Sequence, residues 1–407
     1  MSESVYIVVG AGHAGAAAVA AMRGAGFAGR VILIGDEPYA PYERPPLSKG
    51  VLLSPGTSLC PIYPADYYDS HNIETRLGTL VERIEPATRH LVLASGETLS
   101  YDKLLLATGS SARHYPLLDA LGEGVHVLRT LRDAQGLQKN LVSGRHLLVV
   151  GGGIIGLEAA SSAAQLGLAV TVLERASRLM TRGVPPPLAN ILRILHEQHG
   201  VRFELNVELT EATRGTDGQF HLHAADGRGV SGSSILYGVG VELNDRLARE
   251  AGLAVDNGVL VDELCRSSVQ EIFAAGDIAR QFQPFLGAAV RQETWANAVH
   301  QGALAGRAMV TGEGGAFEVP WYWTDQYGIN FQVAGKHEAD EWLVRGDPAG
   351  GKYMLFGLTE GRVTGAVTVN NGRDMKLAKL MIVAGVSPDP ALLCDTTLDL
   401  RKLKPLT

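Results

Sequence analysis

The pattern of hydrophobic positions repeats one arrangement in two parts of the chain. Residues 5–9 form a short run of apolar, mostly β-branched side chains, followed by a glycine turn at 10–15 and an alanine-rich stretch. Residues 146–150 form a second apolar run, followed by a glycine turn at 151–156 and another apolar stretch. Short apolar runs that end at glycine predict buried strands, and the stretches after the turns have the composition of helices.

Both turns contain three glycines with the spacing G-x-G-x-x-G: Gly10, Gly12 and Gly15, then Gly151, Gly153 and Gly156. Between a strand and a helix, the first glycine permits the tight turn, the second lets a pyrophosphate approach the backbone, and the third lets helix and strand pack closely. The helix start offers free N–H groups and the positive end of its dipole. Further strands are expected at 31–34 and 169–173. The chain is therefore expected to contain two βαβ dinucleotide-binding units; turns that serve packing alone are the alternative.

An acidic residue follows the second strand of each unit, and the two acids differ in position. Glu174 ends its strand directly, where a carboxylate would accept a hydrogen bond from a ribose 2′-OH and repel a 2′-phosphate. This favours NAD(H) over NADP(H), although the guanidinium of the neighbouring Arg175 can neutralise a phosphate. In the first unit the acid is Asp36 or Glu37. A solvated loop charge is the alternative for either acid.

Two further strand ends indicate that the first nucleotide is a flavin. Residues 102–107 are interpreted as a buried strand before Thr108-Gly109-Ser110, and residues 272–275 as another before Gly276-Asp277. A glycine there admits a cofactor, and a carboxylate can accept hydrogen bonds from polyol hydroxyls. Open α/β sheets bind their ligands at this edge. In isolation, Gly-Asp would indicate an ordinary turn.

Size and composition limit the class of protein. The chain has 407 residues, 46% hydrophobic and 19% charged, which predicts two or three folded domains. Its net charge of −7 at pH 7 argues against a general attraction to nucleic acid or anionic membranes. No apolar run approaches the roughly 20 residues that span a bilayer. The first four residues, Met-Ser-Glu-Ser, lack the basic start of a secretory signal.

The three cysteines restrict the chemistry further. Cys60, Cys265 and Cys394 are more than 100 residues apart and form no C-x-x-C pair. This spacing argues against a zinc site, an iron–sulfur site and a C-x-x-C redox pair. Each cysteine is expected to be a small buried or surface residue. The sequence therefore predicts a cytoplasmic protein, in a reducing compartment, that binds no metal.

Short motifs spread over the whole chain resemble those of one family. They are 10–15 (GAGHAG), 42–49 (YERPPLSK), 107–110 (ATGS), 128–130 (LRT), 151–158 (GGGIIGLE), 275–277 (AGD) and 321–326 (WYWTDQ). In this combination and order, the chain resembles the FAD-dependent ferredoxin reductases. More narrowly, it resembles the NADH:ferredoxin reductase components of bacterial Rieske-type oxygenase systems, which act in aromatic hydrocarbon catabolism. Putidaredoxin and rubredoxin reductases are near relatives.

The resemblance implies an α/β fold of the glutathione-reductase type. Two Rossmann-like domains would bind FAD and NAD, and a smaller α+β domain with an antiparallel sheet would follow. The FAD-binding domain would be discontinuous, formed by residues 1–112 and 242–318. The NAD-binding domain would occupy 113–241, and residues 319–407 would form the C-terminal domain.

The resemblance also implies which residues bind the cofactors. Those lining FAD would be Asp36, Lys49, Val81, Arg129, Asp277 and Trp295. Glu158 and Glu174 would face NADH, and Trp323, with Trp321 as the alternative, would lie near both the flavin and the nicotinamide. The rest of the expected cofactor-binding set is Gly10, Gly12, His13, Ala14, Gly15, Arg44, Ala107, Thr108, Gly109, Gly151, Gly153, Ile154, Ile155, Gly156, Arg175, Gly240, Gly276, Glu293 and Thr294. His13 stands where relatives often have a smaller or apolar residue, and no specific role is assigned to it.

The chemistry implied is hydride transfer without an active-site disulfide. Residues 42–46 occupy the stretch in which disulfide-using relatives have reactive thiols. Hydride transfer requires the two reacting atoms to be about 3–3.5 Å apart, which is a positioning task. The expected catalytic residues are Lys49, Glu158 and Trp323: a buried ammonium at Lys49 would favour an anionic reduced flavin, and Glu158 would balance that charge. A solvated loop lysine is the alternative for Lys49.

The expected partner is a small acidic [2Fe–2S] ferredoxin. A flavin accepts two electrons together and releases them singly, so it can connect NADH with one-electron carriers. Residues 321–407 contain 10 Lys and Arg and 10 Asp and Glu, so the net negative charge lies in the rest of the chain. Arg373, Lys376 and Lys379 recur every three residues and would share one face of a helix, which is a candidate docking surface. A merely solvated helix face is the alternative.

Three functions remain open on the sequence. The first, which the motifs favour, is an FAD-dependent NADH:ferredoxin reductase. The second is a reductase of rubredoxin or of a small radical or peroxide, because monodehydroascorbate reductases share the Glu-Arg-Pro-x-Leu-Ser-Lys stretch found at 43–49. The third is a redox-responsive interaction flavoprotein of the apoptosis-inducing-factor type. No targeting segment or long disordered insertion supports the third.

Overall fold

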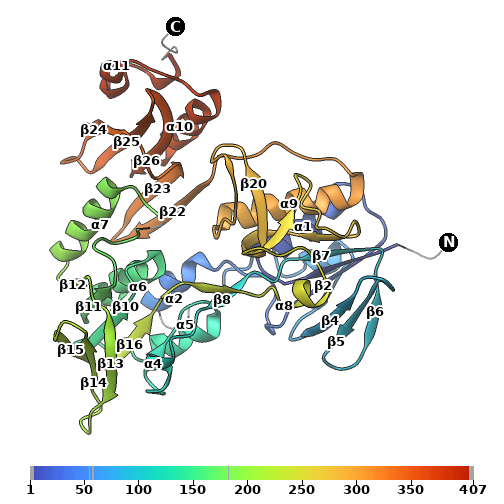
Figure 1. The fold of residues 1–407 in the computed structure, drawn as a ribbon, viewed down its shortest axis with the longest axis horizontal. Helices are drawn as coiled ribbons and strands as arrows, with labels where there is room; N and C mark the ends of the chain where they lie inside the picture. The colour runs from blue at the N-terminus through green and yellow to red at the C-terminus, as the bar shows by residue number, and fades with distance from the viewer. Residues whose placement is uncertain (1–3, 55, 57–58, 182, 403–407) are drawn as a thin grey trace. The chain divides into compact units, whose positions relative to one another are not determined.

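The computed structural model describes residues 4–54, 56, 59–181 and 183–402 (Figure 1). Its contacts divide the chain into two compact units, each made of segments that are distant in sequence. The first unit comprises Met1–Glu43, Leu59–Ser111 and Glu242–Pro320. The second comprises Arg44–Ser58, Ala112–Val241 and Trp321–Thr407. The boundaries of the three expected domains stay a prediction.

A parallel five-stranded sheet forms the centre of the first unit, with the spatial order β19-β7-β1-β2-β3. Its strands are β1 (Val5–Val9), β2 (Arg30–Ile34), β3 (Ile73–Arg76), β7 (Lys103–Leu106) and β19 (Ile272–Ala274). After their first residues, the strands β1, β2 and β7 are buried on both faces, as is all of β19, so these stretches are continuously apolar instead of alternating. The chain passes from β1 to β2 and β3 on one side, while β7 and β19 lie on the other. The point between β1 and β7 is therefore the topological switch point of this sheet.

Two helices of the first unit pack side by side, α1 (His13–Gly24) and α9 (Trp295–Thr311) (Figure 1). Two glycines of α9 permit the close approach. A Cβ atom at Gly302 would lie 2.2 Å from the carbonyl oxygen of Ala14, and one at Gly306 would lie 2.3 Å from that of Ala18. The helix that starts at the first glycine turn is thus held by backbone contact with a helix from a distant part of the chain.

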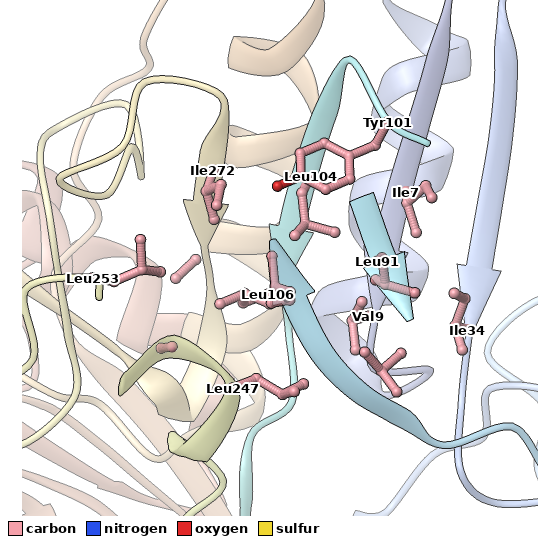
Figure 2. Close-up of a cluster of buried hydrophobic side chains, with 14 of the residues drawn as sticks. Ile7, Val9, Ile34, Leu91, Tyr101, Leu104, Leu106, Leu247, Leu253 and Ile272 are labelled. Carbon is pink, nitrogen blue, oxygen red and sulfur yellow. The ribbon is translucent and has the colours of Figure 1, made fainter. Parts of the chain in front are cut away.

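Smaller elements complete the first unit. They are the antiparallel sheet of β4 (Val81–Glu85), β5 (His90–Leu93) and β6 (Thr98–Ser100); the sheet of β18 (Val259–Val261), β20 (Ala279–Gln283) and β21 (Ala288–Val290); and the helices α3 (Tyr67–Ser70), α8 (Arg246–Glu250) and η2 (Gly276–Ile278). Figure 2 shows a hydrophobic cluster that includes Leu91 of β5, Leu104 and Leu106 of β7, Leu247 of α8 and Ile272 of β19. This cluster joins the small antiparallel sheet to the parallel one.

The second unit repeats the parallel five-stranded arrangement, with the order β12-β11-β10-β16-β9. Its strands are β9 (Val125–His126), β10 (His146–Val150), β11 (Ala169–Glu174), β12 (Arg202–Leu205) and β16 (Ser234–Tyr237). Here the switch point lies between β10 and β16. The helix α6 (Ile154–Gln165) follows β10 as α1 follows β1. Both predicted strand–turn–helix–strand units are therefore present.

The remaining elements of the second unit are shorter or belong to its last segment. The helices are η1 (Pro45–Ser48), α2 (Gly50–Leu53), α4 (Pro116–Asp119), α5 (Leu131–Gln138), α7 (Pro186–Gln198), α10 (Gly372–Ala384), α11 (Pro390–Cys394) and η3 (Leu400–Lys402). A small antiparallel sheet consists of β13 (Leu209–Arg214), β14 (Phe220–Ala224) and β15 (Gly229–Gly232). The short strands β8 (Ser110–Ala112) and β17 (Val241–Leu243) include positions at which the chain passes from one unit to the other.

The last segment forms an antiparallel sheet with the order β22-β23-β26-β25-β24, as the resemblance implied. Its strands are β22 (Trp321–Gln326), β23 (Ile329–Gly335), β24 (Glu341–Asp347), β25 (Lys352–Thr359) and β26 (Arg362–Val369). The helix α10 lies against β23 and β26 (Figure 1). Leu157 of α6, Leu192 of α7 and Phe331 of β23 share one buried cluster, so this sheet packs on the helices of the second unit. None of the helices in the described ranges is long and apolar enough to cross a membrane.

Candidate functional site

The first glycine turn lies at the switch point of the sheet in the first unit. Gly10 follows β1 and has φ +116°, and a Cβ there would lie 2.1 Å from the carbonyl oxygen of Ala107, which follows β7. A Cβ at Gly15 would lie 1.9 Å from the carbonyl oxygen of Gly10. A Cβ at Gly12, by contrast, would meet no atom of the described residues within 4 Å. Gly10 and Gly15 therefore serve packing, whereas Gly12 leaves open space at the N-terminus of α1.

The second glycine turn has the same division of roles. A Cβ at Gly151, where φ is +109°, would lie 2.4 Å from the carbonyl oxygen of Gly238, the residue after β16. One at Gly156 would lie 2.3 Å from the Gly151 carbonyl oxygen. At Gly153, within the part of the chain that the structure describes, nothing lies within 4 Å. Both turns thus leave, at the start of a helix, the space that a pyrophosphate group requires, so the residues fit a dinucleotide at each turn.

Glu174 is fixed beside the second turn by two backbone hydrogen bonds. Its Oε2 accepts from the N–H of Gly152 at 2.7 Å, and its Oε1 accepts from the N–H of Ala176 at 2.7 Å. Arg175, the next residue, is exposed. Each carboxylate oxygen can accept a second hydrogen bond, so Glu174 keeps capacity for a ribose hydroxyl. Its contact with NADH stays a prediction.

Asp277 and Gly10 lie at the same end of the parallel sheet in the first unit. Asp277 follows β19, and its Oδ2 accepts a hydrogen bond from the hydroxyl of Ser110 at 2.7 Å. Arg291 donates to the Asp277 backbone carbonyl at 3.2 Å. Asp36 is exposed two residues after the end of β2, at the same end of the sheet. The carboxyl ends of β1, β2 and β19 therefore bring together Gly10, Asp36 and Asp277, as the strand-end pattern predicts.

Of the other expected residues of the first unit, Ala107 is buried beside Gly10, and Gly276 is buried beside Ala14. The hydroxyl of Thr108 donates to the Asn244 carbonyl oxygen at 2.9 Å, Gly109 has φ +65°, and Val81 is the first residue of β4. Glu293 forms an ion pair with Arg291 at 2.7 Å, and Thr294 caps α9, of which Trp295 is the first residue.

One residue of the first unit was missed by the sequence interpretation. Glu43 joins His13 to Trp295: its Oε2 lies 2.9 Å from Nε2 of His13 and accepts from Nε1 of Trp295 at 2.7 Å. Burial acts to raise the pKa of Glu43, but the hydrogen bonds from His13 and Trp295 outweigh it and leave that pKa lowered. His13 is thus a structural partner of Glu43, which no local pattern around the glycine turn indicates.

In the second unit, Lys49 and Glu158 form an ion pair, with Nζ 2.8 Å from Oε1 and side chains that are 20% and 3% exposed. The Thr324 hydroxyl donates to Oε1 of Glu158 at 2.6 Å, and the Ser48 hydroxyl donates to Oε2. Lys49 also donates to the carbonyl oxygen of Pro45 at 3.2 Å. Lys49 is therefore a paired, largely buried cation and not a solvated loop lysine. Its contact with a flavin stays a prediction.

Trp323 stacks on Trp321, with ring centroids 5.9 Å apart and an interplanar angle of 30°. The ammonium of Lys379, on α10, lies 4.6 Å from the centroid of the Trp321 ring. Trp323 and the basic face of α10 are thereby linked through two close contacts.

The remaining expected residues of the second unit lie near these groups or near the second turn. Arg44 donates to the backbone carbonyl of Arg129 at 2.8 Å, just before α5. Ile154 and Ile155 begin α6. Gly240 has φ +113° and accepts a hydrogen bond from the backbone N–H of Arg113 at 3.1 Å.

The sequence interpretation also missed the polar residues around Glu158. Ser48 and Thr324 contact it directly, and Gln326 and His196 lie beyond Thr324. Thr324 and Gln326 are polar residues two positions apart on a strand, both buried, which is a signal that a buried polar network is present. His196 lies on an amphipathic helix and has no comparable signal.

The described residues contain no cluster of His, Cys, Asp and Glu suited to a metal ion. The three cysteines of the chain are all free. Cys265 is buried, and this burial raises the pKa of its thiol to about 12. A thiol of this kind is inert as a nucleophile at neutral pH.

Comparison with known proteins identifies the family. The family model described as pyridine nucleotide-disulphide oxidoreductase matches residues 4–302, and the model described as reductase C-terminal matches residues 321–404. The chain belongs to the pyridine nucleotide-disulphide oxidoreductase family. It is 43% identical, over 95% of this chain and 99% of the relative, to the 3-phenylpropionate/cinnamic acid dioxygenase ferredoxin–NAD(+) reductase component of Photorhabdus laumondii. It is 41% identical, over 98% and 99%, to the anthranilate 1,2-dioxygenase system ferredoxin–NAD(+) reductase component of Burkholderia cepacia.

Solved structures agree with this assignment. The fold matches putidaredoxin reductase, in its covalent complex with putidaredoxin, with a TM-score of 0.93 and 31% identity over 99% of this chain and 98% of that chain. It matches a ferredoxin reductase from Rhodopseudomonas palustris with a TM-score of 0.92 and 32% identity over 98% and 99%. The matches confirm the predicted resemblance, the fold class, the class of oxidoreductase and the two cofactors, FAD and NAD(H).

Proposed function

We propose that this chain oxidises NADH and delivers the electrons, through bound FAD, to a small [2Fe–2S] ferredoxin that serves a Rieske-type dioxygenase. The relatives described above are named as ferredoxin–NAD(+) reductase components of dioxygenase systems. The observation that carries the proposal is the buried Lys49–Glu158 pair in a chain whose three cysteines are all free. Bound FAD supplies the conversion of a two-electron donor into single electrons.

Each glycine turn holds the pyrophosphate of one dinucleotide, FAD at Gly12 and NADH at Gly153. The open space at both residues, together with the first N–H groups of α1 and α6, supports this assignment. Asp36 and Asp277 then lie at the sheet edge where FAD hydroxyls would donate hydrogen bonds to their carboxylates.

The preference for NADH over NADPH rests on Glu174. Two backbone N–H groups hold its carboxylate beside the second turn, so the charge cannot easily move away from an incoming nucleotide. A fixed negative charge accepts a ribose 2′-OH and repels a 2′-phosphate. The exposed Arg175, the next residue in sequence, opposes this effect.

Lys49, Glu158 and Trp323 orient the reactants and do not act as acid or base in the hydride transfer. Glu158 holds the Lys49 ammonium in one position through the 2.8 Å ion pair, where it would stabilise negative charge on the flavin ring. Glu158 itself is held by Ser48 and Thr324, so the carboxylate and the ammonium are preorganised.

The helix α10 is the proposed docking surface for the ferredoxin. Arg373 and Lys376 are exposed on it, and Leu380 and Val383 continue the exposed surface at 56% and 55% exposure. A basic face that also presents apolar side chains suits an acidic partner, because charge steers the encounter and apolar contact stabilises it. The contacts from Lys379 through Trp321 to Trp323 link this surface to the proposed flavin side and support it over a merely solvated face.

The direct test compares electron acceptors. Holoenzyme is reduced with NADH and offered a [2Fe–2S] ferredoxin, a rubredoxin, monodehydroascorbate radical or oxygen, each at several concentrations. We expect the highest kcat/KM with the ferredoxin. A higher value with rubredoxin or with the radical would contradict the proposed acceptor while leaving the assignment of FAD and NADH intact.

A further inference from the structure

A continuous chain of polar side chains leads from Glu158 into the interior of the second unit. Thr324 donates to Glu158 Oε1 at 2.6 Å, and Gln326 Nε2 donates to Thr324 Oγ1 at 3.0 Å. Gln326 Oε1 lies 2.6 Å from Nε2 of His196, and Nδ1 of His196 lies 3.0 Å from the Tyr327 hydroxyl. Thr324, Gln326 and His196 are buried. The backbone N–H of Tyr327 donates to the hydroxyl of Ser161 at 3.0 Å, which ties the far end of the chain back to α6.

The chemistry of these groups gives the hydrogen bonds between them one donor-to-acceptor direction. Burial lowers the pKa of His196 to about 4, so at neutral pH its ring has one N–H group and one lone pair. Burial raises the pKa of Tyr327, so its hydroxyl keeps the proton and can donate it to Nδ1. Because the Gln326 amide donates to Thr324, its carbonyl oxygen faces Nε2 of His196, and the N–H of His196 is therefore at Nε2. The Gln326 amide donates to Thr324, whose single proton points to Glu158.

The opposite direction is incompatible with an ionised Glu158. If the Gln326 amide were rotated by 180°, its oxygen would accept the hydrogen bond from the Thr324 hydroxyl. The oxygen atoms of Thr324 and Glu158, 2.6 Å apart, would then face each other without a proton between them. Only a protonated Glu158 would relieve this repulsion. The donor-to-acceptor direction of these hydrogen bonds and the charge of Glu158 are therefore coupled.

We propose that Gln326 and His196 are positioning residues that keep Glu158 ionised and turned toward Lys49. Neither residue touches Glu158; they act through Thr324, by directing each donor of the chain toward the carboxylate. The inference deepens the proposed function, because it rests on the assignment of Lys49 and Glu158 to the hydride-transfer site. The charge of that site then depends on two residues in a different part of the second unit.

Other charges near Glu158 have partners of their own. The elements packed against α6 are η1, α2, β10, β11 and β22. The titratable residues on or directly beside them are Arg44, Lys49, Arg145, His146, Glu174, Arg175, Tyr322, Asp325 and Tyr327. The Lys49 ammonium lies 2.8 Å from Oε1 of Glu158. Arg44 donates to the Arg129 carbonyl, His146 bonds to Thr171, Glu174 to the backbone and Asp325 to Asn330.

The first test is a measurement on the wild-type protein. Nitrogen NMR of holoenzyme labelled with ¹⁵N-histidine distinguishes the two neutral tautomers, and the signals of His196 are identified by their loss in His196→Gln. At pH 7 we expect neutral His196 with its proton on Nε2. A proton on Nδ1, or a doubly protonated ring, would overturn the proposal.

The second test asks whether Gln326 influences the hydride-transfer site through Glu158. The rate constant for reduction of the flavin by NADH, and the Kd for NADH, are measured by stopped flow at pH 7. In Gln326→Met, which keeps the volume and removes both hydrogen bonds, we expect the rate constant to fall by roughly threefold to tenfold while the Kd for NADH stays unchanged.

The matched control is His199→Gln. His199 stacks on Tyr327 with ring centroids 3.8 Å apart but lies outside the hydrogen-bonded chain. We expect the control to leave the rate constant for flavin reduction at the wild-type value. An unchanged rate constant in folded Gln326→Met, or an equal fall in both variants, would overturn the proposal, and if Gln326→Met does not fold the tautomer of His196 decides. Neither test uses ferredoxin, so a failure of the proposed acceptor remains distinguishable from a failure of this inference.

Discussion

Gly153 and Gly156 lie three residues apart in the second turn and are glycine for different physical reasons. A Cβ at Gly156 would collide with the backbone of Gly151, whereas one at Gly153 would enter open space before α6. The φ of Gly153 is −81°, which any L-residue adopts without strain. Folding thus requires one of these glycines, and the proposed binding of NADH requires the other.

This difference predicts opposite outcomes for two alanine substitutions. Gly153→Ala should leave the free energy of unfolding unchanged and raise the Kd for NADH about tenfold, equal to about 1.4 kcal/mol. Gly156→Ala should destabilise the protein by about 1–3 kcal/mol, because the added methyl group overpacks the turn. Calorimetric NADH titration and urea unfolding of the holoenzyme measure the two effects. Similar changes in both variants would contradict the assigned roles.

His196 predicts a pH dependence of stability. Its pKa in the folded protein, about 4, lies below the value of about 6.5 expected in the unfolded chain. Since the folded state disfavours the protonated ring, His196 leaves stability intact above pH 6.5 and lowers it as the pH falls toward 4. At pH 5 the expected loss is about 2 kcal/mol.

Urea unfolding at pH 7 and pH 5 measures this loss. We expect His196→Gln to be less stable than the wild type at pH 7 but to lose about 2 kcal/mol less between the two pH values. His223→Gln is the control, because His223 is exposed on β14 and should leave the pH dependence as in the wild type. If His196→Gln and the wild type lose the same stability, the ring is not buried in its neutral form.

At the scale of elements, local patterns predicted those parts of the fold that depend on neighbours in sequence. The apolar runs at 5–9 and 146–150 form strands that are buried on both faces, and each run is followed by a glycine turn. Their strand–turn–helix units could therefore be predicted from the sequence. The close packing of α1 on α9 was not, because Gly302 and Gly306 contact backbone almost 300 residues away. A helical glycine gives no sign of which backbone it approaches.

The candidate site shows the same limit. Lys49 and Glu158 were predicted from motifs, whereas His196 comes from α7 and meets Gln326 of β22 only in the folded chain. A buried histidine on an amphipathic helix has the same local sequence whether it packs against apolar groups or completes a hydrogen-bond chain. Such partners follow from tertiary structure and not from periodicity.

The proposed docking helix α10 gives a prediction at this scale. Replacing Arg373 and Lys376 together by glutamate should slow reduction of an acidic ferredoxin roughly tenfold at low salt, because like charges oppose the encounter. The difference from the wild type should shrink as the ionic strength rises. Reduction of ferricyanide, a small acceptor, and of the flavin by NADH should stay at the wild-type rate in stopped-flow measurements.

A charge reversal elsewhere controls for net charge. Arg193 lies on α7 with a side chain that is 38% exposed, and it pairs with Glu197 at 2.6 Å, so Arg193→Glu changes the charge of the second unit without altering α10. We expect it to leave ferredoxin reduction close to the wild-type rate. Equal slowing by the α10 variant and by Arg193→Glu, or equal loss of ferricyanide reduction in the α10 variant, would argue against docking on this helix.

For the whole molecule, the distinguishing property is a family fold named for disulfide chemistry in a chain without a disulfide. Cys265 is buried with a raised thiol pKa, Cys60 is exposed and Cys394 is half-buried. Turnover should therefore be independent of all three thiols. We expect NADH-reduced holoenzyme treated with iodoacetamide, and the double variant Cys60→Ser, Cys394→Ser, to reduce ferredoxin at the untreated rate. In a disulfide-using enzyme, reduction by NADH exposes a thiolate that alkylation blocks. Loss of turnover that requires both NADH and iodoacetamide, and that mass spectrometry traces to one alkylated cysteine, would show that electrons pass through sulfur in this protein.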